Sequence, residues 1–276
     1  MGRIARKVWL GIGAVSLIGA GAAAPVSGQH KGHGTTPPAT GKDANAIAAP
    51  RTGEAYLTDG GPKDTRIRIY RDIALMRGHL LIGAELIELG LWDEALPHFL
   101  HPTEELYGLM ERYIKLHRVT PFDRQLKAQA QAVKARNKAA FLQSARVVDK
   151  RLSAALAAFK RYMTGEPFTS YTMRTVVEVL KVAQSEYEAA IEGSRFAKPV
   201  EYQDSRGFVA HVEALLRSQE AELRRIDAAR FEQLMSILAE LKTAWPTPMP
   251  PAAPVVPVDG VAAHVRAFEA AAQRFY

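Results

Sequence analysis

The sequence predicts an all-α protein, an antiparallel up-and-down bundle of four to six helices. Three observations predict this class. Long segments repeat apolar residues every three or four positions, these segments are rich in alanine, glutamate and lysine, and runs of β-branched residues are few. The chain shows no strand alternation, no glycine-rich phosphate loop, no Gly-x-Ser-x-Gly elbow and no His-Glu-x-x-His motif. Such a bundle does not by itself define a function.

Composition narrows the function classes. The 276 residues are enough for one large or two small domains. The chain has no cysteine, which excludes disulfides, thiolate metal sites, a cysteine nucleophile and a lipid anchor on cysteine. The net charge is +7, of which Arg3, Arg6 and Lys7 supply three charges. Elsewhere basic residues are spread among acidic ones, as between Glu220 and Asp227, so nucleic-acid binding is not predicted.

The N-terminus has the pattern of an export signal. Residues 1–28 place basic residues before an apolar run from Val8 to Ala24, followed by small residues. We expect cleavage and a periplasmic protein; the alternative is an uncleaved anchor, because the apolar run approaches the length of a membrane span. Membrane contact is expected only through such an uncleaved signal. Residues 29–62 are rich in Gly, Pro, Thr and Ala, which is typical of a flexible tether.

The bundle is expected over residues 63–245, and its first helix from Asp64, a good N-cap, to Gly90, a good C-terminal stop. One apolar face of this helix carries Leu75, His79, Ile82, Leu86 and Leu89. His79 therefore lies on the buried stripe. A buried histidine with one hydrogen bond is commoner at such a position than a metal ligand, and both interpretations remain open.

The next segment concentrates histidines and acids. Four side chains would share one face of a continuous helix here: Glu94, His98, His101 and Glu105. Imidazole and carboxylate groups in this arrangement suit a first-row metal. Pro97 and Pro102 argue against continuity, so a short helix is expected to end near His101 and a new one to begin at Pro102. Such a junction is equally compatible with a metal site and with two exposed polar side chains.

Two long helices are predicted further along, over residues 120–163 and 201–245, with a shorter one from about Ser170 between them. Residues 246–258 contain many prolines and are expected to form an extended linker. Residues 259–276 are expected to form an amphipathic helix that docks on the bundle.

The last long helix carries a second candidate ligand set. Glu201, Asp204 and His211 would project on one side of a helix that continues through Gly207. Carboxylates suit Fe³⁺, and imidazole suits Fe²⁺, copper or zinc. The alternative is that both acids occupy the first helical turn because the helix dipole favours them there.

A family resemblance lies on the same residues. Glu186-Tyr187-Glu188-Ala189-Ala190-Ile191-Glu192-Gly193, followed by Glu201-Tyr202-Gln203-Asp204 and Phe208, resembles the periplasmic helical region fused to some bacterial high-affinity iron permeases. Those regions more usually carry Asp before the first Tyr and Glu-Met where this chain has Asp204-Ser205. A second, shorter pattern, His101-Pro102-Thr103-Glu104, is similar to the His-x-x-Glu motif of imelysin-type iron-uptake proteins, which has no proline inside it.

The resemblance implies an exported protein that captures or passes on a metal ion, iron in the first place, with an inner-membrane metal permease as partner and no bond-breaking chemistry. The predicted ligands are Glu201 and Asp204 with His211 or Tyr202, joined across the bundle by Glu186, His98, His101 or Glu105. The alternative is an exported helical interaction or scaffold module in which these residues are surface and cap groups. A peptidase is the least favoured interpretation, because the sequence shows no nucleophile and no group arranged to activate water.

Overall fold

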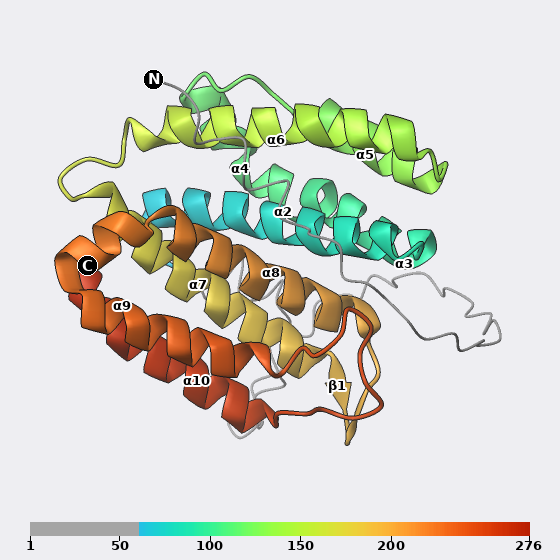
Figure 1. The fold of residues 1–276 in the computed structure, drawn as a ribbon. Helices are drawn as coiled ribbons and strands as arrows, with labels where there is room; N and C mark the ends of the chain where they lie inside the picture. Colours follow the sequence, from blue (N-terminus) through green and yellow to red (C-terminus); the bar gives the residue numbers. More distant parts are fainter. Residues whose placement is uncertain (1–60) are drawn as a thin grey trace, which may run out of the picture. The chain divides into compact units, whose positions relative to one another are not determined.

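A computed structural model describes residues 61–276, and Figure 1 shows their helices stacked in layers. The all-α prediction is confirmed. The predicted signal at 1–28 and nearly all of the tether at 29–62 lie outside the described residues. The helices are α2 (Thr65–Glu88), α3 (Trp92–His101), α4 (Tyr107–Leu116), α5 (Asp123–Lys134), α6 (Lys138–Lys160), α7 (Phe168–Ala189), α8 (Pro199–Ser218), α9 (Glu220–Lys242) and α10 (Val258–Ala272), with a final 3₁₀ turn η3 (Gln273–Phe275). None of them combines the length and the hydropathy that a membrane span needs.

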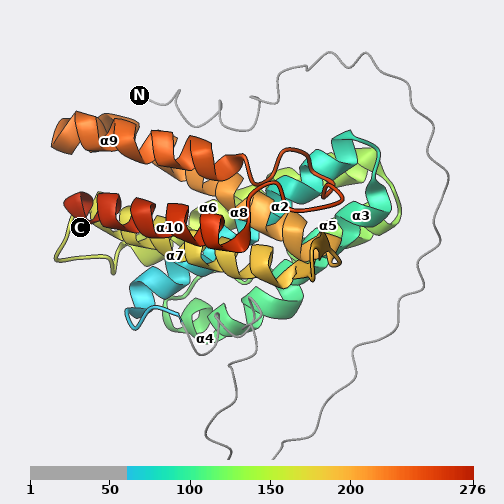
Figure 2. The same cartoon turned by 90° about the horizontal axis from the view of Figure 1, so that it is seen from below.

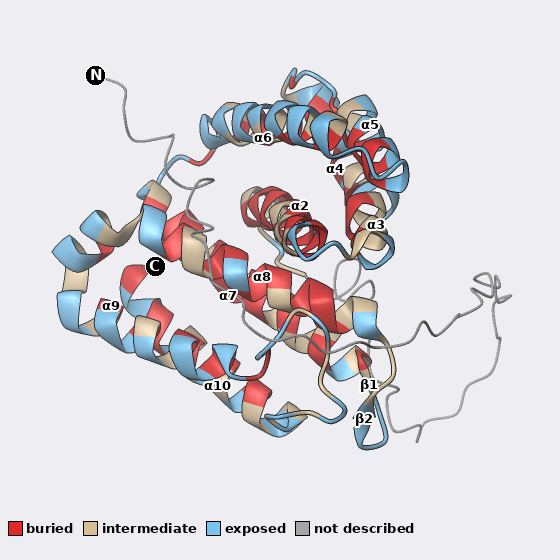
Figure 3. Cartoon of the chain, turned by 45° about the vertical axis from the view of Figure 1, so that its right-hand side comes forward, coloured by how far each residue is buried: buried red, intermediate tan, exposed pale blue. Residues whose placement is uncertain are grey.

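Helix α2 is the central element. It begins after Asp64, whose carboxylate accepts a hydrogen bond from Arg66 N at 2.8 Å, and it ends at Glu88, followed by the cap residue Leu89 and by Gly90, whose φ of +80° favours glycine. Figure 3 shows α2 buried between the α5–α6 layer and the α7–α8 layer. This position explains why α2 is buried on most of its circumference rather than along one stripe.

The prediction of one helix over residues 120–163 is wrong. The chain leaves the helix after Lys134, Arg136 has a φ of +49°, and Asn137 caps α6 by accepting a hydrogen bond from Ala140 N at 3.0 Å. Helices α5 and α6 therefore fold back on each other and pack as a hairpin. Helix α5 begins at Asp123, after Phe122, and not at the predicted residue 120.

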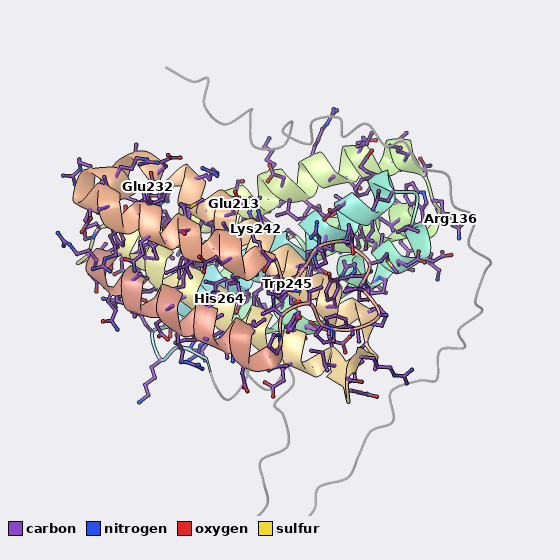
Figure 4. All side chains as sticks on the ribbon, turned by 60° about the horizontal axis from the view of Figure 1, so that its bottom comes forward. Arg136, Glu213, Glu232, Lys242, Trp245 and His264 are labelled. Carbon is purple, nitrogen blue, oxygen red and sulfur yellow. The ribbon has the colours of Figure 1, made fainter. Side chains whose placement is uncertain are left out.

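The prediction of one helix over residues 201–245 is also wrong. Helix α8 ends at Ser218, and α9 turns back beside it, with a kink at Asp227 (φ −162°, ψ 94°). The Asp227 carboxylate accepts a hydrogen bond from Arg230 N at 2.9 Å and so caps the second part of α9. An ion pair between Lys242 and Glu213, both labelled in Figure 4, joins the end of α9 to the C-terminal half of α8.

The connections on both sides of the candidate ligands are short. Helix α3 contains Pro97 and ends at His101, as expected, and a π-helical turn η2 (Pro102–Leu106) begins at Pro102 and links α3 to α4. Helices α7 and α8 are joined by a two-stranded hairpin of β1 (Ile191–Glu192) and β2 (Arg195–Phe196), in which Gly193 adopts a positive φ of 65°. Seen from below in Figure 2, α9 lies at the top of the view and α4 at the bottom, with α2, α7 and α8 between them.

The proline-rich segment, residues 246–257, lacks helix and strand but is tied to the bundle. The Tyr202 hydroxyl donates to the carbonyl oxygen of Thr247 at 2.8 Å, and the Tyr187 hydroxyl donates to that of Val256 at 2.7 Å. Helix α10 then packs against α7 and α9. The segment is therefore held on the ends of α7 and α8 by side-chain hydrogen bonds.

Candidate metal centre

Three histidines converge on one buried carboxylate. His79 Nδ1 and His98 Nδ1 lie 2.6 and 2.7 Å from Asp204 Oδ1, and His101 Nδ1 lies 3.0 Å from Oδ2. His79, His98 and Asp204 are almost fully buried, whereas the His101 side chain is 20% exposed. The groups come from α2, α3 and α8, so the bundle itself assembles the cluster.

A close helix crossing brings α2 and α8 together at this point. A Cβ atom on Gly207 would lie 2.4 Å from the Gly78 carbonyl oxygen, so the two backbones touch where both residues lack a side chain. His79 follows Gly78 and its ring packs edge-on against Phe208, with centroids 4.8 Å apart. The two glycines thus set the distance at which His79 meets Asp204.

The π-helical turn positions the next acid. His98 and His101 lie on the last turn of α3, and the wider turn that follows brings Glu105 Oε1 to 3.7 Å from His101 Nδ1. Single π turns inside helices are frequent at functional sites. Two overlapping groups have donor atoms within 4.8 Å of one another: His79, His101 and Glu105, and His79, His98 and Asp204.

Gln203 fixes the orientation of His98. The Gln203 amide nitrogen donates to Met249 Sδ at 3.2 Å, so the amide oxygen faces His98 Nε2 at 2.9 Å and accepts its N–H. In the neutral imidazole this leaves the lone pair of Nδ1 directed at Asp204 Oδ1. The 2.7 Å between His98 Nδ1 and Asp204 Oδ1 is a hydrogen-bond distance, so a proton on Nδ1 or a cation bound by both atoms can satisfy this contact. Metal-binding histidines characteristically donate their other ring N–H to an oxygen in this way.

Three further carboxylates, Glu105, Glu186 and Glu201, lie around the cluster and are partly exposed. Burial, together with the charges of Asp204, Glu105 and Glu201, raises the pKa of Glu186 well above its ordinary value. Burial also raises the pKa of Glu201, and Asp204 adds to the effect. The carboxylates therefore repel one another, and a bound cation would relieve that repulsion.

The central groups show the opposite effect. Burial opposes ionisation of Asp204, but the charges of His79 and His98 and the hydrogen bonds from His101 and His79 hold its pKa well below the ordinary value. Burial lowers the pKa of His79, against the attraction of Asp204. Burial also opposes the charge on His101, yet its bond to Asp204 and the nearby acids raise its pKa to about 9. A proton held on His101 thus compensates the buried carboxylate.

Two predicted ligands lie outside the cluster. The Tyr202 hydroxyl is bonded to Thr247, and its ring packs against Phe196. His211 is seven residues beyond Asp204, about 10 Å along the helix, where its Nε2 has no hydrogen-bond partner and burial lowers its pKa to about 3. Glu94 is exposed on α3. The other predicted ligands, His98, His101, Glu105, Glu186, Glu201 and Asp204, gather at one place.

Two contributors were not identified from the sequence as parts of a site. His79 was assigned to the apolar stripe, where it does lie; its pairing with Asp204 depends on the Gly78–Gly207 crossing, which periodicity does not reveal. Gln203 stands inside the quoted Glu-Tyr-Gln-Asp motif, directly before Asp204. Its position next to Asp204 was the only indication in the sequence that Gln203 could support the site.

The donor set fits a first-row metal ion. Such ions bind imidazole nitrogen and carboxylate oxygen at about 2.0–2.2 Å, which places neighbouring donors about 3 Å apart around an octahedral centre. The nitrogen–oxygen distances in the cluster are 2.6–3.0 Å, so shifts of a few tenths of an ångström would admit an ion. The fold and this centre together define a helical bundle with a preformed histidine–carboxylate cluster.

Comparison with known families supports the earlier resemblance. Residues 169–276 match the family model of the iron permease-associated 4-helix bundle domain. The match covers α7 to α10 and confirms the relationship to the permease-associated helical region; it gives no support to the imelysin resemblance. No curated protein and no solved structure matches the chain. Glu186, Glu201 and Asp204 lie inside the match, and the three histidines lie on the helices before it.

Proposed function

We propose that this chain is an exported, non-catalytic protein of iron uptake that binds a metal ion at the cluster around Asp204 and hands it on to a membrane permease. The observation that carries the proposal is the convergence of three histidines on one buried carboxylate, with His98 Nδ1 2.7 Å from Asp204 Oδ1 and the other ring nitrogen of His98 held 2.9 Å from the Gln203 amide oxygen. The family match, which concerns iron permease-associated domains, makes iron the first candidate among metals that such donors accept.

The arrangement of donors fits capture and release. Glu105, Glu186 and Glu201 are partly exposed acids next to the buried histidines, so a hydrated cation would meet carboxylates first and imidazoles afterwards. The periplasmic location rests on the sequence of residues 1–28, and the permease partner rests on the description of the matched family.

Metal titration of the purified protein tests the proposal. We expect about one iron ion per chain at micromolar or tighter affinity, and loss of binding in the double variant His98→Gln/His101→Gln with unchanged helical circular dichroism. His264→Gln is the matched control, because His264 lies on α10 outside the cluster (Figure 4). Equal binding by both variants, or no uptake of Fe²⁺, Fe³⁺, Zn²⁺ or Cu²⁺ by the wild type at micromolar concentrations, would contradict it.

The second candidate is an exported scaffold without metal chemistry. One observation favours it: the histidines of the cluster are all within hydrogen-bond distance of Asp204, so protons alone can satisfy the site. In that case the titration shows no uptake, while Asp204→Asn still destabilises the fold because the histidines lose their common acceptor.

A further inference from the structure

The outer layer of α5 and α6 concentrates the positive charge of the chain. Residues 123–161, called the basic layer from here on, contain ten Lys and Arg against two Asp, a net charge of +8. The whole chain carries +7, so all other residues together carry −1. The basicity of the protein is therefore a property of this layer, which lies outside the family match.

Most of this charge is not neutralised within the fold. Asp149 pairs with Arg77 of α2, at 2.6 Å, and so compensates a charge from outside the layer. Near the turn of the hairpin, Arg136 pairs with Asp93, and Lys138 pairs with Glu88. The following basic residues form no ion pair with any residue that the structure describes: Arg124, Lys134, Arg146, Lys150, Arg151 and Arg161.

Apolar side chains are exposed among these charges. Leu142 and Val147 on α6 are 40% and 41% exposed. Leu142, Arg146 and Lys150 follow at steps of four and share the outer face of α6, which Figure 3 shows as exposed. A basic helix face that also exposes large apolar residues is typical of helices that lie on a membrane surface. A surface for an acidic protein would need the charges but not the exposed leucine and valine.

We propose that the basic layer docks on a membrane surface rich in anionic phospholipid. Arg146, Lys150 and their neighbours contact the headgroups, and Leu142 and Val147 enter the boundary between headgroups and acyl chains. This docking is independent of the metal centre, because the layer shares no residue with the cluster around Asp204. It holds the folded part of the chain against the bilayer in addition to any attachment at the N-terminus.

A local fluorescent label tests the docking in the full chain. Since the chain has no cysteine, Gln143→Cys, on the outer face of α6, takes a single environment-sensitive dye, and Ser236→Cys, exposed on α9, takes the same dye as control. Vesicles of phosphatidylcholine mixed with phosphatidylglycerol are expected to shift the emission at 143 but not at 236. Pure phosphatidylcholine vesicles should shift neither, and roughly 0.5 M salt, where the screening length is about 4 Å, should reverse the shift. The local readout separates this contact from lipid binding by the apolar N-terminal segment.

Charge variants complete the test. Arg146→Gln/Lys150→Gln should lower the affinity for anionic vesicles, measured with the dye at 143, about 30-fold. Each basic side chain near an anionic surface contributes about a factor of five to that affinity. Arg225→Gln/Lys242→Gln removes two exposed charges from α9 and should leave the response unchanged. No response to anionic vesicles, an equal response to neutral ones, or equal losses in both double variants would overturn the proposal. A response to polyglutamate without one to vesicles would overturn it in favour of an acidic protein partner.

Discussion

Asp204 is the residue on which the candidate centre depends. A buried carboxylate is costly unless it is paired, and here three imidazoles share the compensation. The His98 ring is also held in one orientation, because its Nε2 contacts the Gln203 amide oxygen and the Gln203 amide nitrogen donates to Met249 Sδ. The contacts from Met249 through Gln203 to His98 therefore fix the orientation of the His98 ring toward Asp204.

Replacing Gln203 tests this chain of contacts. Gln203→Leu removes the acceptor of the His98 Nε2–H, so the ring loses its fixed orientation and metal affinity should fall about 10- to 100-fold. Isothermal titration with Zn²⁺, which has no redox chemistry, measures the change. Gln143→Leu alters an exposed glutamine on α6 and should have no effect. Unchanged affinity in Gln203→Leu would mean that His98 is not a ligand.

Sequence reasoning at this scale found most of the acids and two of the three histidines. Asp204 and Glu201 were predicted because they share a motif, and His98, His101 and Glu105 because they share a helical face. His211 fulfilled the same spacing rule as Asp204 but lies two turns further along α8, where no other ligand reaches it. Spacing identifies residues on one side of a helix; it does not show which turn another helix approaches.

At the scale of helices, the crossing of α2 and α8 controls the site. Both residues at the crossing are glycines, and a Cβ on Gly207 would also lie 2.9 Å from Ile82 Cγ2. The two backbones can approach this closely only because positions 78 and 207 both lack a side chain, whatever polar residues lie nearby. The distance between His79 and Asp204 is thus fixed by residues that take no part in binding.

Gly207→Ala should separate the two helices. The clash with the Gly78 carbonyl exceeds the helix-propensity gain of about 1 kcal/mol, so we expect a net loss of about 1–3 kcal/mol in the free energy of unfolding. Metal affinity should fall as His79 moves away from Asp204. Urea unfolding and zinc titration measure the two effects.

Gly108→Ala is the matched control for this substitution. Gly108 also lies inside a helix, α4, but a Cβ there would meet no atom within 4 Å. This variant should gain up to about 1 kcal/mol of stability from helix propensity and keep the metal affinity of the wild type. Destabilisation by both variants to the same extent would show that the crossing is not special.

The helices were predictable in kind but not in length. Apolar periodicity continues across Ala135–Asn137 and across Ser218–Glu220, because the helices on both sides of each break face the same core. The breaks themselves lack glycine and proline: the first uses Arg136 at positive φ before an Asn cap. The positive charge of residues 123–161 can be counted from the sequence. It becomes evident as one basic layer only when the structure shows that α5 and α6 pack together.

At the scale of the molecule, the candidate centre joins two parts of the chain. Helices α7 to α10 correspond to the matched family, while α2 and α3 provide the histidines. A ligand that contacts both parts, and that binds the folded chain but not the unfolded one, stabilises the whole fold by mass action. Thermal stability with and without metal is therefore a global readout of a local site.

That stabilisation should increase with pH. The His101 pKa is about 9 in the folded chain against an ordinary 6.5, so its proton stabilises the metal-free fold fully below pH 6.5, and this contribution is lost as pH rises toward 9. A metal ion must displace the same proton, so its affinity should rise about tenfold, or ~1.4 kcal/mol, per pH unit across this window. The Asp204 pKa is lowered, so the stability that the Asp204 carboxylate contributes is lost only in acid, below this pH window.

The difference in melting temperature between zinc-bound and metal-free protein should therefore grow by roughly 3–6 °C per pH unit between pH 6.5 and 8.5. In His101→Gln, which has no proton to displace, the difference should not depend on pH in this way; a wild-type difference that stays constant would place the metal elsewhere.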